Sequence, residues 1–478
     1  MKRFLSALTV LMLLFLCLFS VSLAEDGEDF LTDGDYRYCI MADGTARLVA
    51  YTGKSNELII PAEFGGAPLT VIGPNAFKRN SSLNRVEIPD TVVEIGDYAF
   101  FYCRKLTYVN IPDSVRTVGR NPFAACENLS EIGISKSHPH LTLRDGGVLY
   151  SLEDSRLVYY SMMMPRGAYT VADGTRIIGA SAFYACGTLT GLSLPETVSS
   201  VGNQAFCACT GLKSINLPEN LSYLGDGAFN ECSALHSLVC PGMITRIGES
   251  AFEGCSGLEE LVLPEGATSI GDKAFAGCSS LISIELPEEI ESIGHNTFDG
   301  CRSLRKIVLP ADVTYIGSYA FRNCYALEEI NIPEEVSYIG NYAFCFCSSL
   351  KSLELPDTCL YIGDSAFQSC SALEVLTLPR MLNTIHTGVF AGCLNLAEIH
   401  LPPRVTAIGD QAFMGCRSLA SIDVPGKVAS IGSFAFYGCI ALESAVLPDS
   451  LTYLAPNAFE GCPNLAHPPD PAAYSEKQ

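Results

Sequence analysis

The chain has 478 residues and a formal net charge of −22, from 52 acidic and 30 basic side chains. A balance this acidic repels nucleic acid phosphates and anionic lipid headgroups, so we expect neither as a partner. Hydrophobic residues make up 48% of the sequence, which is ample for a continuous core, and the length alone would suggest about three domains.

The first 24 residues have the pattern of a secretory signal. Lys2 and Arg3 precede an apolar run from Phe4 to about Leu23, and small residues stand at its end, as a signal peptidase requires. We therefore predict a cleaved signal peptide over residues 1–24 and a secreted or cell-surface protein. The alternative is an uncleaved membrane anchor, for which the run is barely long enough. No later stretch is long and apolar enough, so we expect no membrane span after signal removal.

Residues 25–69 are predicted to form an N-terminal β cap. Within them, residues 36–40 and 46–51 flank a turn at Asp43-Gly44, a pattern typical of a β-hairpin. Such a hairpin would cover the first of the repeated units that follow. A stack of repeats needs a cover at its end, because the open end exposes unpaired strand edges and core.

The rest of the chain is organised by a phenylalanine that recurs every 23 residues. Self-similarity at this period predicts a stack of repeated coils, and it overrides the length-based estimate of three domains. The series has sixteen members, and its step is broken once: Phe77, Phe100, Phe123, then Phe183, Phe206, Phe229, Phe252, Phe275, Phe298, Phe321, Phe344, Phe367, Phe390, Phe413, Phe436 and Phe459.

The sequence of one repeat predicts the structure of one coil of the stack. Residues 281–286 alternate between apolar and polar side chains, which indicates a strand, and Pro287 ends it because proline has no amide donor. Gly294 is expected to form a turn through backbone angles that other residues resist. Residues 297–301 are predicted to make a single helical turn. A coil of 23 residues cannot bury so many apolar side chains alone, so neighbouring coils must pack together as a solenoid.

The repeat pattern Ala-Phe-x-x-Cys-x-x-Leu-x-x-Ile-x-Leu-Pro-x-x-Val-x-x-Ile-Gly resembles the BspA-type leucine-rich repeat of secreted and surface proteins, over roughly residues 70–465. The resemblance implies a mainly β, right-handed leucine-rich stack of about 16 coils. It also implies a role in adhesion or protein binding, although a fold alone does not specify a function.

An insertion interrupts the series between Phe123 and Phe183, which are 60 residues apart, 37 more than one repeat. It separates a first repeat segment (residues 70–134) from a main segment (residues 170–465). Within residues 135–169, two apolar runs at 146–150 and 156–160 predict a second hairpin that projects from the stack. This hairpin either binds a ligand or acts as a spacer that changes the curvature between the two segments.

The C-terminal residues 466–478 form a short tail. Pro468, Pro469 and Pro471 follow the last coil, and prolines deny hydrogen bonds to any further strand, so we expect them to close the stack.

Fifteen of the 21 cysteines stand three residues after a repeat phenylalanine, or its equivalent position, and so form a ladder. Their wide spacing on one line does not fit a zinc site, and we expect buried thiols that act as small hydrophobic side chains. Neighbouring thiols could alternatively pair as disulfides in an oxidising compartment. His138 and His140 give a weak metal signal or belong to a solvated loop. No catalytic, cofactor-binding or metal-binding residue is therefore predicted, and we expect neither a cofactor nor enzyme activity.

Tyrosines supply the candidate interaction surface. Five of them occupy the position just before the repeat Ile-Gly or its equivalent, and two more lie close by in adjacent coils; the set is Tyr223, Tyr315, Tyr338, Tyr361 and Tyr453, with Tyr319 and Tyr342. Tyrosine gives a large contact area with few rotamers to freeze, which suits an interface. The alternative is cross-strand pairing that only stiffens the sheet.

A second candidate is the row of charged side chains on the main strand, such as Lys306 and Glu329, whose signs alternate between coils. Concave surfaces of repeat stacks are the usual place for protein ligands. We therefore predict an extracellular interaction or adhesion protein that binds a protein or glycan through its repeat faces. The first alternative is a structural scaffold or spacer without a specific ligand, and the second is a secreted enzyme.

Overall fold

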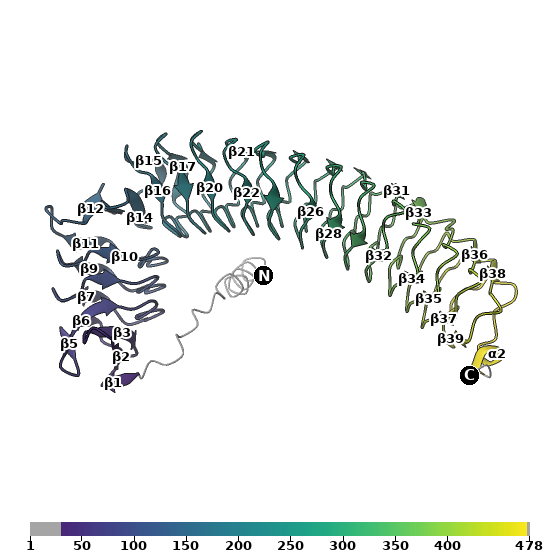
Figure 1. The fold of residues 1–478 in the computed structure, drawn as a ribbon, viewed down its shortest axis with the longest axis horizontal. Helices are drawn as coiled ribbons and strands as arrows, with labels where there is room; N and C mark the ends of the chain where they lie inside the picture. Colours follow the sequence, from purple (N-terminus) through teal and green to yellow (C-terminus); the bar gives the residue numbers. More distant parts are fainter. Residues whose placement is uncertain (1–29, 476–478) are drawn as a thin grey trace, which may run out of the picture.

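The computed structural model describes residues 30–475, and the predicted signal peptide lies outside these described residues. Figure 1 shows a hooked solenoid with two arms that meet at a sharp corner. We call residues 30–134 the short arm, residues 135–160 the corner hairpin and residues 161–475 the long arm. The long arm is a gently curved arc, so that the whole molecule surrounds one hollow.

Most coils contribute two strands, one to each of two rows, although residues 378–420 contain no strand of the outer row. The outer row holds the strands of the Leu-x-x-Ile-x-Leu segment: β4 (Glu57–Ile59), β7 (Arg85–Glu87), β9 (Tyr108–Ile111), β11 (Glu131–Ile134), β15 (Gly167–Thr170), β17 (Leu189–Ser193), β19 (Ser214–Ile215), β21 (Ser237–Val239), β23 (Glu260–Val262), β25 (Ser283–Glu285), β27 (Lys306–Val308), β29 (Glu329–Ile330), β31 (Ser352–Glu354), β33 (Val375–Thr377), β36 (Ser421–Asp423) and β38 (Ser444–Val446).

The inner row holds the two-residue strands that precede the repeat glycine position: β8 (Glu94–Ile95), β10 (Thr117–Val118), β16 (Ile177–Ile178), β18 (Ser200–Val201), β20 (Tyr223–Leu224), β22 (Arg246–Ile247), β24 (Ser269–Ile270), β26 (Ser292–Ile293), β28 (Tyr315–Ile316), β30 (Tyr338–Ile339), β32 (Tyr361–Ile362), β34 (Thr384–Ile385), β35 (Ala407–Ile408), β37 (Ser430–Ile431) and β39 (Tyr453–Leu454). In the long arm, Figure 1 places β31, β33, β36 and β38 along the outer edge of the arc. It places β32, β34, β37 and β39 along the inner edge.

Strands of neighbouring coils pair in parallel with a step of one repeat. In the inner row Tyr315 lies opposite Tyr338, and in the outer row Lys306 lies opposite Glu329. The strand predicted at residues 281–286 is confirmed in a shorter form, β25, and it ends before Pro287. Because the pairings between successive repeats keep this step, equivalent side chains form rows along the stack, as the sequence predicted.

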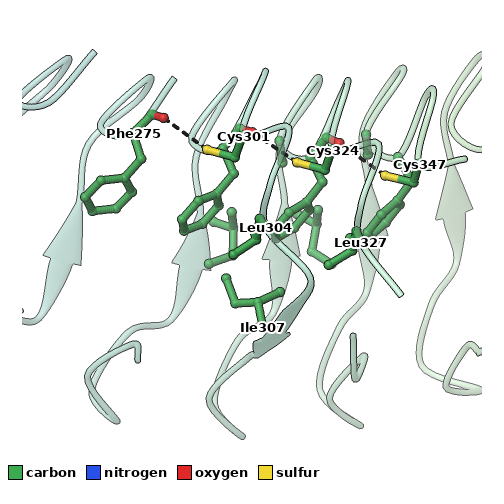
Figure 2. Packing of buried hydrophobic residues seen from close by; sticks show 14 of the residues in the cluster. Phe275, Cys301, Leu304, Ile307, Cys324, Leu327 and Cys347 are labelled. Carbon is green, nitrogen blue, oxygen red and sulfur yellow. Dashed lines mark hydrogen bonds between the residues drawn. The ribbon is translucent and has the colours of Figure 1, made fainter. Parts of the chain in front are cut away.

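The phenylalanine row is the centre of the core (Figure 2). Phe298, Phe321 and Phe344 are fully buried, and their ring centroids are 5.3 Å apart in successive coils. Leu304 and Ile307 pack beside them in the same cluster. Burying one such side chain contributes about 1.5–3 kcal/mol, and no single coil could supply this contact surface alone. The core is therefore continuous from coil to coil.

The predicted helical turn at residues 297–301 is wrong. Gly300 within this segment and Asn296 just before it have φ values of 76° and 55°, so left-handed residues stand where a helical turn would need right-handed ones. Its backbone instead bonds to the next coil, since Phe298 N–H donates to Ala320 O and Gly300 N–H donates to Arg322 O, both at 2.8 Å. Residues 296–302 surround Phe298. We call these residues, together with the equivalent residues of the other coils, the turn ridge.

The role predicted for Gly294 also needs correction, because its φ is not in the left-handed region. A Cβ at this position would lie 2.4 Å from Asp272 Oδ1 in the preceding coil. In the next coil a Cβ at Gly317 would lie 2.6 Å from the carbonyl carbon of Gly294. Glycine stands here because adjacent coils approach too closely for a side chain.

The N-terminal hairpin is confirmed. Strands β2 (Tyr36–Ile40) and β3 (Ala46–Tyr51) pair antiparallel, and β1 (Leu31–Asp33) adds a third strand on β2. Strand β3 then pairs in parallel with β6 (Ala67–Ile72), and β5 (Glu63–Phe64) pairs with β6 as well. The cap thereby continues directly into the inner row of the short arm.

The inserted hairpin is also confirmed, but it does not project from the stack. Strands β12 (Leu141–Arg144), β13 (Val148–Ser151) and β14 (Arg156–Tyr160) form an antiparallel sheet, and β14 pairs in parallel with β16. Both faces of β13 and β14 are buried. A strand buried on both faces cannot project into solvent, so the insertion is an internal layer between the two arms.

The two faces of this layer belong to different cores. Leu149, Val158 and Tyr159 pack into the core of the short arm, whereas Leu157 and Tyr160 pack into that of the long arm. Tyr159 meets the ring of the last short-arm phenylalanine at 5.6 Å, and Tyr160 stacks on the first long-arm phenylalanine at 4.8 Å. The aromatic row thus crosses the corner through two adjacent tyrosines.

Contacts between the two parts of the turn ridge fix the corner on its inner side. The ring of Phe101 lies 6.1 Å from that of Tyr184, in a small buried cluster of its own. Tyr98 Oη and Ser181 Oγ share a hydrogen bond of 2.8 Å, and Asn121 Nδ2 donates to Ser181 O at 2.6 Å. These contacts join the arms at the angle seen in Figure 1.

The last coil is covered by the proline-rich segment and a short helix, α2 (Ala472–Ser475). Pro468, Pro469 and Pro471 lie with Phe459 around a cavity of about 270 Å³. Tyr474 packs against the edge of the long-arm core. The end of the phenylalanine row is therefore screened by residues outside the repeat.

Candidate functional site

Three of the predicted tyrosines form a continuous ladder on the inner row. The ring centroids of Tyr315 and Tyr338 are 5.0 Å apart and those of Tyr338 and Tyr361 are 4.7 Å apart, with planes within 9° of parallel. The isoleucine that follows each tyrosine is buried, so the tyrosine points out of the core. We call Tyr315, Tyr338 and Tyr361 the tyrosine ladder.

A histidine stands at each end of this ladder. The ring of His295 lies 6.1 Å from Tyr315 at a near-perpendicular angle, and its Nε2 lies 3.4 Å from Tyr315 Oη. His295 Nδ1 accepts a hydrogen bond from Ser318 N–H at 3.1 Å. The ring of His386 lies 4.9 Å from Tyr361. The aromatic surface therefore spans five successive coils, and the sequence pattern of tyrosines alone did not reveal its two ends.

The stacking decides which parts of the ladder a ligand can reach. Each ring face is covered by the neighbouring ring, and a sugar could not stack on it without separating the rings. The three side chains as a whole are half-exposed, so a ligand would reach them from the ring edges and hydroxyl groups. Burial raises the pKa of Tyr315 and Tyr361, and their neighbour Tyr338 adds to this effect. The phenols of Tyr315 and Tyr361 are therefore neutral near pH 7 and can both donate and accept hydrogen bonds.

Tyr319 and Tyr342 form a second, shorter stack on the turn ridge, with ring centroids 5.1 Å apart. Both have positive φ values, 62° and 56°, which are unusual for bulky side chains. Arg322 lies over the Tyr319 ring at 4.6 Å and also pairs with Asp299, Nε to Oδ1 at 3.0 Å. The structure thus brings these two predicted residues together, but in a row separate from the ladder.

The remaining two predicted tyrosines stand apart from both stacks. Tyr223 is 47% exposed and donates a hydrogen bond to Asn203 Oδ1 at 3.1 Å, and Tyr453 is 48% exposed. Neither ring makes an aromatic contact within residues 30–475. The seven candidates are therefore a ladder of three, a stack of two and two single residues.

The charged row on the main strand lies on the outer edge of the arc, away from the hollow (Figure 1). Lys306 Nζ and Glu329 Oε2 are 2.7 Å apart, as the alternation of charge predicted. Both side chains are largely exposed, so this pair contributes little stability. The row is better explained as pairing between coils than as a ligand surface.

The cysteine ladder has a role that the sequence did not show. Cys301 Sγ donates to Phe275 O in the preceding coil, and the next two coils repeat this bond, each at 3.2 Å (Figure 2). Every described cysteine is a free thiol, so the alternative of disulfide pairing along the ladder is wrong. Burial, with smaller effects from Cys324 and Asp299, raises the pKa of the Cys301 thiol well above its usual range. Such a thiol is a poor nucleophile.

The two histidines of the insertion are structural. His138 is buried, its Nε2 lies 3.0 Å from Pro112 O, and its Nδ1 accepts hydrogen bonds from the backbone N–H groups of His140 and Leu141. His140 Nδ1 lies 3.0 Å from Glu153 Oε1. Because both nitrogens of His138 are occupied, it has none left for a metal.

Across residues 30–475, no group of three or more His, Cys, Asp and Glu side chains is arranged to hold a metal ion. The same residues contain no helix that is long and apolar enough to cross a bilayer.

Comparison with solved structures finds leucine-rich repeat proteins from bacteria. One from Bacteroides ovatus is 27% identical, with 91% of this chain and 93% of that chain covered and a TM-score of 0.48. A leucine rich cell surface protein from Faecalibacterium prausnitzii is 24% identical, with 92% and 94% covered and a TM-score of 0.35. A leucine rich repeat protein of T. pallidum is 25% identical, with 53% and 91% covered and a TM-score of 0.25. No curated protein matches the chain.

The sequence also matches a family model, the BspA type leucine rich repeat region. The matches cover residues 52–143, 176–305, 268–397 and 383–468. Together they include both arms and omit most of the corner hairpin. The chain belongs to the family of proteins with BspA-type leucine-rich repeats.

Proposed function

We propose that this is an extracellular binding protein that recognises a partner protein through the tyrosine ladder. A protein-interaction role is consistent with its leucine-rich repeat family. The predicted signal peptide supports an extracellular or cell-surface location, where such a protein would act in adhesion.

The observation that carries this proposal is the ladder itself, with its ring faces covered and its side chains half-exposed. A row of phenol groups about 5 Å apart offers alternating apolar edges and hydrogen-bonding groups. Such amphipathic contacts are typical of the centres of protein interfaces, because little side-chain entropy is lost on binding. The rings are already ordered by stacking, which lowers this cost further.

A glycan remains the alternative ligand, and the geometry disfavours it in one respect. Sugar recognition by aromatic residues uses an open ring face, whereas the ladder offers such a face only where a ring lacks a neighbour. A scaffold without a ligand is the other alternative, in which stacking would only stiffen the inner row. A secreted enzyme is the least supported alternative, because the described cysteines are buried thiols, which are poor nucleophiles.

The test uses two triple variants of the ladder, tyrosine to phenylalanine and tyrosine to serine at positions 315, 338 and 361. Binding to immobilised extracellular matrix proteins would be measured by surface plasmon resonance. We expect the phenylalanine variant to keep its fold and stacking but to lose about tenfold or more in affinity, since three interfacial hydroxyl groups are removed. The serine variant should lose binding entirely.

The matched control is the double variant Tyr223→Phe, Tyr453→Phe, which changes the two tyrosines that stand apart from both stacks. It should bind the ligand as the wild type does. Unchanged binding by both triple variants would contradict the proposal, because the ligand would then bind elsewhere on the chain. Absence of binding by the wild type would favour the scaffold. Binding of the chain to purified glycans on an array, in the absence of any other protein, would favour the glycan alternative.

A further inference from the structure

A second surface lies on the turn ridge of the last coils, in a row different from the tyrosine ladder. Between residues 368 and 440 the ridge is hollowed into a shallow groove of about 440 Å³. The lining residues occupy equivalent positions in successive coils, so the groove runs along the axis of the stack. At about 4.8 Å per coil, its length is about 14 Å, which matches about four residues of extended chain.

One side of the groove is formed by the residues that follow the ladder cysteines. They are Leu394, Arg417 and Ile440, and the two apolar members are 38% and 47% exposed. The other side is formed by residues that follow the repeat phenylalanines, including Met414 and Tyr437. Tyr437 is 41% exposed. Exposed apolar side chains on both sides make this a surface that gains free energy when covered.

The floor of the groove consists of glycines. Gly392, Gly415 and Gly438 have φ values of 75°, 73° and 70°, a conformation that side chains resist. At the equivalent positions of two earlier coils stand Asn323 and Phe346. A Cβ at Gly438 would meet nothing within 4 Å, so the space above this glycine is open. Gly254, Gly277 and Gly300 form a similar row in earlier coils, but Glu253 and Asp299 stand there at the positions of Met414 and Tyr437. The apolar side chains beside the glycines therefore distinguish this groove from the earlier row.

The charge at the groove indicates what it binds. No acidic residue lines it, although the chain as a whole carries a net charge of −22. Arg417 is exposed, and within residues 30–475 it makes no ion pair. An unpaired guanidinium beside apolar side chains favours a carboxylate flanked by apolar groups.

We propose that this groove binds an extended segment of a partner protein that carries apolar side chains and a carboxylate, with the carboxylate on Arg417. Leu394, Tyr437 and Ile440 contact the apolar side chains. The groove shares no residue with the tyrosine ladder, so this inference is independent of the ladder's function.

The test uses fluorescein-labelled short peptides and the full chain, with binding measured by fluorescence anisotropy. One probe alternates leucine with glutamate, and its matched probe replaces glutamate with lysine. We expect the glutamate peptide to bind at least about tenfold more tightly than the lysine peptide. Arg417→Glu should reverse this preference, and Ile440→Asp should weaken binding of the glutamate peptide at least about tenfold.

Arg302 provides the matched control, because it is an exposed arginine at the position equivalent to Arg417 five repeats earlier. Arg302→Glu should leave the preference for the glutamate peptide unchanged. Circular dichroism would confirm that each variant is folded, and the charge reversal at Arg417 supplies the test if Ile440→Asp unfolds. Equal binding of the two probes, no binding of either, or an unchanged preference in Arg417→Glu would overturn the proposal. So would a dimer in sedimentation that Ile440→Asp abolishes, since a second copy would then occupy the groove.

Discussion

The thiol of Cys301 donates a hydrogen bond to the carbonyl oxygen of Phe275 at 3.2 Å, and this bond joins one coil to the coil before it. Phe275 O also accepts a hydrogen bond from Cys278 N–H within its own turn. The cysteine therefore occupies the second acceptor site of a carbonyl that lies in a dry core. This explains why a small apolar residue such as alanine would not be equivalent at the ladder positions.

The first prediction concerns this bond. Cys301→Ala should lower the free energy of unfolding by about 1–2 kcal/mol, because a hydrogen bond is lost and a small cavity is created. Cys345→Ala is the control, since Cys345 is also buried but its sulfur lies near Gln368 Oε1, at 4.0 Å, and not near a phenylalanine carbonyl. Guanidinium unfolding would measure both changes. Equal losses in the two variants would argue against a contribution from the bond.

The second prediction concerns alkaline pH. Burial raises the pKa of Cys103 and of Cys416 to about 12, whereas the pKa in an unfolded chain is about 8.5. Above about pH 8.5 the unfolded chain loses protons that the folded chain keeps, so ionisation favours unfolding. The stabilisation from each thiol is complete below that pH and is lost as the pH rises towards 12, at about 1.4 kcal/mol per pH unit.

Comparison of the wild type with Cys416→Ala isolates one thiol. The difference between their unfolding free energies should narrow as the pH rises from about 8 to about 10, because only the wild type loses this contribution. Urea unfolding at several pH values would measure the difference. A constant difference across this range would mean that the thiol ionises alike in the folded and unfolded states.

The third prediction separates the tyrosine ladder from the single tyrosines. Tyr338 stacks on a ring at each side, and one such contact contributes about 0.5–1.5 kcal/mol, so Tyr338→Ala should cost about 1–3 kcal/mol. Tyr338→Phe keeps both stacks and should change stability by less than about 0.5 kcal/mol. Tyr223→Ala, at an exposed residue without a stack, should also have a small effect. Thermal unfolding would compare them, and equal losses in both alanine variants would show that stacking adds no stability.

The fourth prediction concerns the corner. The double variant Phe101→Ala, Tyr184→Ala removes the aromatic contact between the two parts of the turn ridge. Both cores should stay folded, since neither ring belongs to them, but the angle between the arms should open. Small-angle X-ray scattering should then report a larger radius of gyration with an unchanged circular dichroism spectrum.

Phe346→Ala serves as the control for the corner. Phe346 is an exposed ring on the same ridge, far along the long arm, and its loss should leave the scattering profile unchanged. A double variant that scatters as the wild type does would show that the buried hairpin and the hydrogen bonds of Ser181 hold the arms at their angle without this aromatic contact.

The sequence by itself determined the repeat and its register. A step of 23 residues in Phe, Cys, Leu and Ile requires parallel stacking, because each coil packs only on its neighbours and the same contacts recur. The two hairpins were also predictable, since alternating apolar residues around turn sequences are local signals. Within one coil, the helical turn and the reason for Gly294 were mistaken, because left-handed residues and close approach depend on the neighbouring coil.

Only the tertiary structure decided the features that depend on contacts between unequal coils. The inserted hairpin has apolar residues on both faces, and the second face is covered only because the two arms meet there. The sequence placed the three tyrosines of the ladder at one position of consecutive coils, whereas the stacking distances of 4.7 and 5.0 Å and the two histidines at its ends come from the tertiary structure. The groove over Gly392, Gly415 and Gly438 likewise depends on which side chains stand beside the glycines in these particular coils. A periodic sequence predicts the packing that is common to all coils. The corner, the tyrosine ladder and the groove instead depend on the positions at which neighbouring coils differ.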